Sequence, residues 1–108
     1  MTKTATADAR VEAPPDDSPH KAVIVRTYSA GVFFGRLVHH QGQEVRLTQA
    51  RRIWRWYGAN TLSEIATKGL DAKQSKVATP VDVVLTQAIE IIDCLPEAIA
   101  CLEGAKWA

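Results

Sequence analysis

The sequence is poor in cysteine and has no long apolar run. Cys94 and Cys101 are the only cysteines among 108 residues, and their spacing matches neither a zinc site nor a redox pair. No apolar segment approaches the roughly 20 residues that cross a membrane, and the N-terminus lacks the hydrophobic segment of a signal peptide. We therefore expect an intracellular protein with free thiols that is not associated with a membrane.

Recognisable catalytic and metal-binding patterns are also missing. His39 and His40 are adjacent, so on a strand their rings point to opposite faces and cannot clamp one metal ion. Ser29 has no flanking nucleophile-elbow glycines and no identifiable base. Gly31 and Gly35 lack the third glycine and the following helix of a phosphate-binding loop. These absences favour a protein that is not an enzyme and that uses no metal or cofactor.

The net charge is only +1, but the charges are unevenly distributed. Residues 1–20 carry two cations and four carboxylates, a net charge of −2. Residues 21–57 carry seven cations and only Glu44 as an acid, a net charge of +6. Residues 58–108 carry four cations and seven carboxylates, a net charge of −3. Six of the seven central cations are arginine, the side chain best suited to phosphate and carboxylate groups. The centre therefore predicts an anionic partner. Alternatively, it pairs with the acidic C-terminal part of a second copy in a homo-oligomer, with a dimer favoured.

The segment Arg51–Gly58 (RRIWRWYG) alternates cationic and aromatic residues. On a strand, the period of two places Arg52, Trp54 and Trp56 on one face. Indoles can stack on bases while guanidinium groups bind phosphate oxygens; alternatively, the tryptophans are core residues covered by arginine stems. We expect Trp54 to be core. The candidate ligand-binding residues are Arg46, Arg51, Arg52, Arg55, Trp56 and Tyr57.

The chain divides into a tail and one domain. Residues 1–20 are rich in Ala, Thr, Asp and Pro, have almost no large apolar side chains, and predict a disordered acidic tail. Residues 21–108 predict a single globular α+β domain. Within it, β-branched and aromatic runs predict four strands, at 22–28, 32–39, 44–48 and 51–57, and Gly35 predicts a bulge or bend in the second. Helical spacing also fits 51–57, but its Trp, Tyr and Ile content favours a strand.

The second half combines helices and strands. Thr61, Glu64 and Gly69 are the N-cap, the capping-box partner and the C-terminal stop of a short helix that begins at Leu62. A polar loop at 71–78 precedes strands at 81–85 and 88–92, and a closing helix covers 95–107, with Trp107 as an anchor. The predicted fold is a small, strongly bent antiparallel sheet or SH3/Sm-like half-barrel, with the two helices over its open side.

Part of this sequence resembles a known family. The run Val25–Val32 (RTYSAGV after Val25), the segment Ala50–Trp56 (ARRIWRW), the Gly58-Ala59 pair, Thr61–Glu64 (TLSE) and Ile89–Ile91 resemble a family of small phage and prophage proteins of unknown function. The resemblance covers residues 22–108 and implies a bacteriophage setting without supplying catalytic residues. Residues 22–57 are more loosely similar to Sm-like and SH3-like barrels, a likeness of fold that does not fix function.

These observations lead to a hypothesis of function. We expect a non-enzymatic phage accessory protein, in the cytoplasm of the host cell, that captures an anionic ligand. The ligand would be nucleic acid or a nucleotide signal of host defence, held by the Arg/Trp segment. The alternatives are an interaction protein that blocks an acidic host protein surface, and a minor virion component.

Overall fold

The computed structural model describes residues 20–105, which form six strands and two helices. The elements are β1 (Ala22–Thr27), β2 (Val32–Gln41), β3 (Glu44–Arg55), α1 (Leu62–Lys68), β4 (Lys76–Val77), β5 (Val81–Leu85), β6 (Ala88–Asp93) and α2 (Pro96–Gly104). The predicted tail, except for His20, and the predicted anchor Trp107 lie outside the described residues. No helix within 20–105 is long and apolar enough to cross a membrane.

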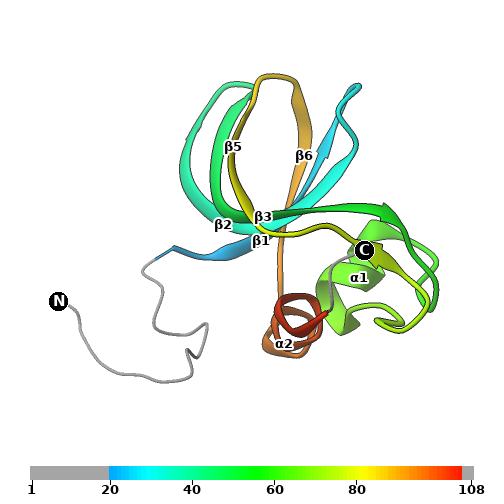
Figure 1. Ribbon diagram of the computed structural model, residues 1–108. Coiled ribbons are helices and arrows are strands. Elements are labelled where there is room, and N and C mark those ends of the chain that lie inside the picture. The colour runs from blue at the N-terminus through cyan, green and yellow to red at the C-terminus, as the bar shows by residue number, and fades with distance from the viewer. Residues whose placement is uncertain (1–19, 106–108) are drawn as a thin grey trace, which may run out of the picture.

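The strands form one bent antiparallel sheet (Figure 1). The strand order is β4-β3-β2-β1-β6. The first half of β3 also pairs with β5, whereas its last residues pair with β4. β5 and β6 follow one another in sequence and diverge from a shared turn, but the sheet pairings of the described residues do not join them. The sheet is therefore strongly bent but unclosed, which confirms the predicted α+β class.

Each side of the sheet carries its own core. The concave side is filled by residues from five strands: Val23, Val25, Phe33, Val45, Leu47, Ala50, Leu85 and Ala88. The outer side packs against both helices through Ala22, Ile24, Phe34, Ile53, Ile65, Ala66, Leu70, Val77, Leu102 and Ala105. Because β1 contributes to both cores, Ala22–Val25 are buried without alternation. The helices thus cover the outer face, and the prediction that they cover the open side was wrong.

The short helix α1 begins and ends where the sequence predicts. The Thr61 hydroxyl accepts a hydrogen bond from the Glu64 backbone N–H at 3.1 Å, and the Glu64 carboxylate accepts one from the Asn60 N–H at 2.9 Å. Gly69 ends the helix at φ 89°, a left-handed value that favours glycine. The Ile65 and Ala66 side chains are buried against α2 and the sheet. This capping explains why a seven-residue helix forms at all.

A single long strand, β3, replaces the two strands predicted at 44–48 and 51–57. It continues through Gln49, whose φ of 53° marks a bulge, and its register with both neighbours shifts there. Opposite the bulge, Gly35 approaches β3 so closely that a Cβ on it would lie 3.1 Å from the Ala50 Cα. The predicted irregularity at Gly35 is confirmed by the register shift between Phe34 and Arg36. The bulge bends the sheet and changes which residues of β3 share a face.

Two further elements differ from the prediction. The second strand, predicted at 32–39, continues to Gln41, so that His39 and His40 are both exposed strand residues. The polar loop predicted at 71–78 contains the two-residue strand β4, which pairs with Ile53 and Arg55. A strand of two residues is below the length at which a sequence pattern becomes visible.

Candidate ligand-binding groove

A groove of about 640 Å³ lies between the second half of β3 and the segment that joins β4 to β5. Phe33, Arg52 and Trp54 line one side, and Ala78, Thr79, Val81 and Val83 line the other. The floor is apolar, because Phe33 belongs to the concave core and Val83 packs against that core. A concave, mostly apolar surface with a few polar groups is the usual form of a small-molecule site.

The bulge at Gln49 places Arg52 and Trp54 in this groove. Before the bulge, the odd-numbered residues Val45 and Leu47 belong to the concave core. Strict alternation would place residue 49 there next, but Ala50 takes that position. The alternation is therefore shifted by one, and the even-numbered residues Arg52 and Trp54 continue the concave face. The predicted shared face of Arg52, Trp54 and Trp56 is thus confirmed for Arg52 and Trp54 alone, because Trp56 packs against the other core.

The guanidinium group of Arg52 lies over the Phe33 ring, 4.8 Å from its centroid. Phe33 is only 2% exposed and lies on β2 opposite Arg52 in the strand register. A cation over an aromatic face is attracted by the ring quadrupole. Phe33 therefore favours a position of the exposed Arg52 charge at the groove.

Arg51 is on the other side of β3, and its side chain is part of the fold. It is 5% exposed, and its Nε and Nη1 donate to the carbonyl oxygens of Ala78 at 2.7 Å and Leu102 at 3.0 Å. Burial lowers the pKa of this guanidinium, which nonetheless stays protonated in proteins. Arg51 is therefore not part of the exposed surface. Its hydrogen bonds connect α2 to the wall of the groove.

The two tryptophans of the motif have exchanged their expected environments. Trp54 is 54% exposed at the groove, so the prediction that it is core was wrong. Trp56, the candidate for a surface role, is half-buried and packs against the core between sheet and helices. The reason is that β3 ends at Arg55, so the period of two no longer applies to Trp56. Phe33 and Thr79 also line the groove, and the sequence does not indicate this role because both are far from the motif along the chain.

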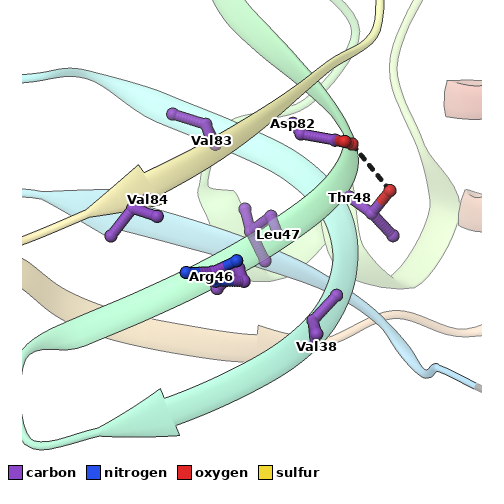
Figure 2. A pocket seen from close by; sticks show the side chains of 7 residues that line it. All are labelled: Val38, Arg46, Leu47, Thr48, Asp82, Val83 and Val84. Atoms are coloured by element: carbon purple, nitrogen blue, oxygen red, sulfur yellow. Dashed lines mark hydrogen bonds between the residues drawn. The ribbon is translucent and has the colours of Figure 1, made fainter.

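Arg46 lines a second, smaller pocket of about 300 Å³ (Figure 2). It is exposed between Val45 and Leu47, which belong to the concave core, so it lies on the outer face. In this pocket the Thr48 hydroxyl donates to the Asp82 carboxylate at 2.7 Å, and Val38 and Val84 supply apolar walls. Arg46 is therefore separated from Arg52 by the thickness of the sheet.

Arg55 and Tyr57 form a third group at the end of β3. The Arg55 guanidinium lies 5.9 Å from the centroid of the exposed Tyr57 ring. Across the ladder, Arg55 is opposite Lys76 of β4, so two cations face one another at this corner. Neither Arg55 nor Tyr57 lines the groove.

Residues 20–102 match the family described as Domain of unknown function (DUF6948). The chain belongs to this family. No curated protein and no solved structure matches the chain.

The charge segregation of the DUF6948 domain is largely resolved within one chain. Three cations of the basic centre pair with acidic residues of the C-terminal part: Lys21 with Asp93 at 3.1 Å, Arg26 with Glu90 at 3.2 Å, and Arg36 with Glu103 at 3.0 Å. The last pair is mostly buried, and Arg36 also donates to the His20 carbonyl at 3.1 Å. Among residues 20–105, Arg46, Arg52 and Arg55 form no ion pair. Because these charges already pair within one chain, they no longer support a dimer held by charge complementarity. Dimerisation stays a prediction.

Thiol and metal chemistry give no second site in the described part of the DUF6948 domain. No group of three or more His, Cys, Asp or Glu residues within 20–105 is arranged to hold a metal ion. Cys94 and Cys101 are free thiols, half-buried against the core between sheet and helices. The Cys101 thiol donates to the Leu70 carbonyl at 3.1 Å, and burial raises the pKa of Cys94 to about 12. Both sulfurs therefore take part in the packing of the core, and the raised pKa keeps Cys94 in its unreactive thiol form at neutral pH.

Proposed function

We propose that this domain is a non-enzymatic binding protein that captures an anionic ligand with a planar ring in the groove of Arg52 and Trp54. The observation that carries the proposal is the joint placement of these two side chains. They are two residues apart on one exposed strand face, and both line an apolar groove of about 640 Å³. A planar cation and a large aromatic surface side by side suit a ligand that is both aromatic and negatively charged.

Nucleotides and nucleic acid have this combination. The base would stack on the exposed indole of Trp54, and a phosphate would receive paired hydrogen bonds from the Arg52 guanidinium. The valine side chains of β5 would cover the opposite side of the base, and Thr79, which also lines the groove, would offer a hydroxyl to a polar group of the ligand.

The groove is held in shape before any ligand binds. The Ala78 N–H donates to the Arg52 carbonyl at 2.8 Å, and the Ala78 carbonyl accepts from Arg51 at 2.7 Å. The contact with Phe33 adds a modest preference, of about 1 kcal/mol or less, for the guanidinium position at the groove. Since ordering a flexible wall lowers affinity, a site whose wall is already fixed binds more tightly than a loose one.

The wider setting supports the same proposal. The bent, unclosed sheet is compatible with an SH3/Sm-like half-barrel, an architecture that serves many kinds of binding, so the likeness does not by itself choose a ligand. The resemblance to phage and prophage proteins suggests that the domain acts in the cytoplasm of an infected host cell, as an antagonist of host defence. A nucleotide signal is a natural ligand in that role.

The proposal is tested by calorimetric titration of the full-length protein with nucleoside monophosphates, with single-stranded DNA and with an acidic peptide. We expect the nucleotide ligands to bind, Arg52→Ala to weaken them at least tenfold, and Arg46→Ala to leave them within about twofold. Arg46 is the matched control, because it is an exposed arginine of the same strand on the other face. Binding of the acidic peptide alone would instead support the alternative, a protein that covers an acidic protein surface.

A further inference from the structure

We infer that the groove accepts a single nucleotide unit rather than a nucleic acid strand. This inference rests on the proposed function and specifies the class of its ligand. A strand carries one phosphate per nucleotide, so a protein that binds it needs a series of cations along one continuous surface. The described residues of this domain do not provide such a series.

The exposed arginines without an ion pair lie on different surfaces. Among residues 20–105, Arg52 is the only cation that lines the groove. Arg46 is on the outer face, six residues earlier in β3, which corresponds to about 20 Å along a strand. Arg55 lies over Tyr57 and outside the groove. A bound strand could therefore reach Arg46 only by passing around the sheet, and to reach Arg55 it would have to leave the groove.

The other cations of the basic centre are already engaged. Lys21, Arg26 and Arg36 pair with carboxylates, and Arg51 is buried with its donors on backbone carbonyls. Their charges are thus compensated by carboxylates or buried. The net charge of +6 on residues 21–57 therefore does not produce an equally strong positive potential at the surface.

Asp82 limits extension of a ligand toward Arg46. It lies on β5 between the groove residues Val81 and Val83, and its carboxylate is held by the Thr48 hydroxyl in the second pocket. A second phosphate directed to Arg46 would approach this carboxylate as well and would be repelled. The arrangement favours a ligand whose negative charge is confined to the Arg52 side.

The size of the groove agrees with this reading. Its volume of about 640 Å³ falls in the range of roughly 300–1,000 Å³ that is typical of small-molecule pockets. Single-strand-binding surfaces instead extend over about 4–16 nucleotides per domain. One base on Trp54 and one phosphate on Arg52 would occupy both the indole and the guanidinium of the groove.

The test is a length series on the full-length protein. The probes are each of the four common nucleoside monophosphates, the matching nucleosides, and 5′-phosphorylated oligonucleotides of two, four and eight nucleotides. Affinity is measured by calorimetry at several salt concentrations. We expect a monophosphate to bind at least tenfold more tightly than its nucleoside. We also expect the dinucleotide to bind no more than twofold more tightly than the monophosphate. The log–log salt slope of the affinity should be no steeper than about −1 and should not change with length.

Two results would overturn the inference, and they differ from failure of the proposed function. Affinity that rises more than tenfold from the monophosphate to the octanucleotide, with a log–log salt slope of about −2 or steeper, would show that several arginines contact successive phosphates. Equal binding of nucleoside and monophosphate would show that Arg52 does not bind the phosphate. If neither nucleotides nor oligonucleotides bind, the proposed function itself is wrong.

Discussion

Arg51 and Arg52 are neighbours in the chain, yet their guanidinium groups lie on opposite sides of β3. Arg51 is buried and donates to carbonyls of Ala78 and Leu102, whereas Arg52 is exposed over the ring of Phe33. The two arginines therefore have different tasks in one structure. Arg51 fixes the wall of the groove, and Arg52 presents a positive charge within it.

This difference leads to opposite expectations for stability. Arg51→Ala should lower the free energy of unfolding by about 2–4 kcal/mol, because the buried carbonyl of Leu102 and the partly buried carbonyl of Ala78 lose their donors. Arg52→Ala should cost about 1 kcal/mol or less, the worth of an exposed cation–π contact. Urea denaturation of the two variants measures both values. Equal costs would show that Arg51 does not brace the wall.

The tryptophans give a second pair of contrasting variants. Trp56→Ala should destabilise the domain by roughly 3 kcal/mol, because a half-buried indole leaves the core between sheet and helices. Trp54→Ala should change the free energy of unfolding by less than about 1 kcal/mol, since more than half of that side chain is already exposed. Thermal and urea unfolding of both variants, with binding measured in parallel, checks the assignment. A large loss of stability for Trp54→Ala alone would contradict it.

Arg36 and Glu103 form the largely buried ion pair between β2 and α2. Removing one partner should be costly: Glu103→Ala is expected to destabilise by about 3–5 kcal/mol, because it leaves the Arg36 charge buried and unpaired. Replacing both, as Arg36→Met with Glu103→Leu, should recover a large part of that loss. A double-mutant cycle in urea gives the coupling. Additive losses from the two single changes would show that the pair is not coupled.

Cys94 makes a pH dependence testable. Burial raises its pKa from the ordinary value of 9.0 to about 12, an effect that the nearby Arg36 charge only partly offsets. An unfolded chain would therefore lose this proton near pH 9 while the folded domain still holds it. Its contribution to stability is complete below about pH 9 and declines as the pH rises toward 12.

The measurement compares the wild-type protein with Cys94→Ala at pH 8 and pH 10.5. The wild type should lose more of its free energy of unfolding over this interval than the variant. Iodoacetamide should also label Cys94 slowly at pH 8 until denaturant is added, because the thiolate is the reactive form. Parallel pH profiles for the two proteins would show that Cys94 does not titrate differently on folding.

Local signals in the sequence were sufficient for most of the fold. The capping residues Thr61 and Glu64 mark the start of α1, and Gly69 marks its end. The β-branched runs mark β1, β2, β5 and β6 within one or two residues. These features were predictable because the residues that determine them are close together in the chain.

The candidate site was less predictable, because tertiary contacts decide it. The face of Arg51 depends on the bulge at Gln49, a residue whose left-handed backbone has no signal in its side chain. The exposure of Trp54 and the burial of Trp56 depend on where β3 ends and on how the helices pack. Phe33 and Thr79 come from distant segments, so only the folded chain places them beside Arg52.

The central claim is that a nucleotide stacks on Trp54 beside Arg52, and the indole N–H signals of the ¹⁵N-labelled full-length protein test it most directly. The Trp54 signal is assigned with Trp54→Phe and the Trp56 signal with Trp56→Phe. Saturating nucleoside monophosphate should shift the Trp54 signal far more than the Trp56 signal, and Arg52→Ala should suppress the shift. A nucleotide that binds while the Trp54 signal stays in place, or that shifts the Trp56 signal alone, would contradict the account.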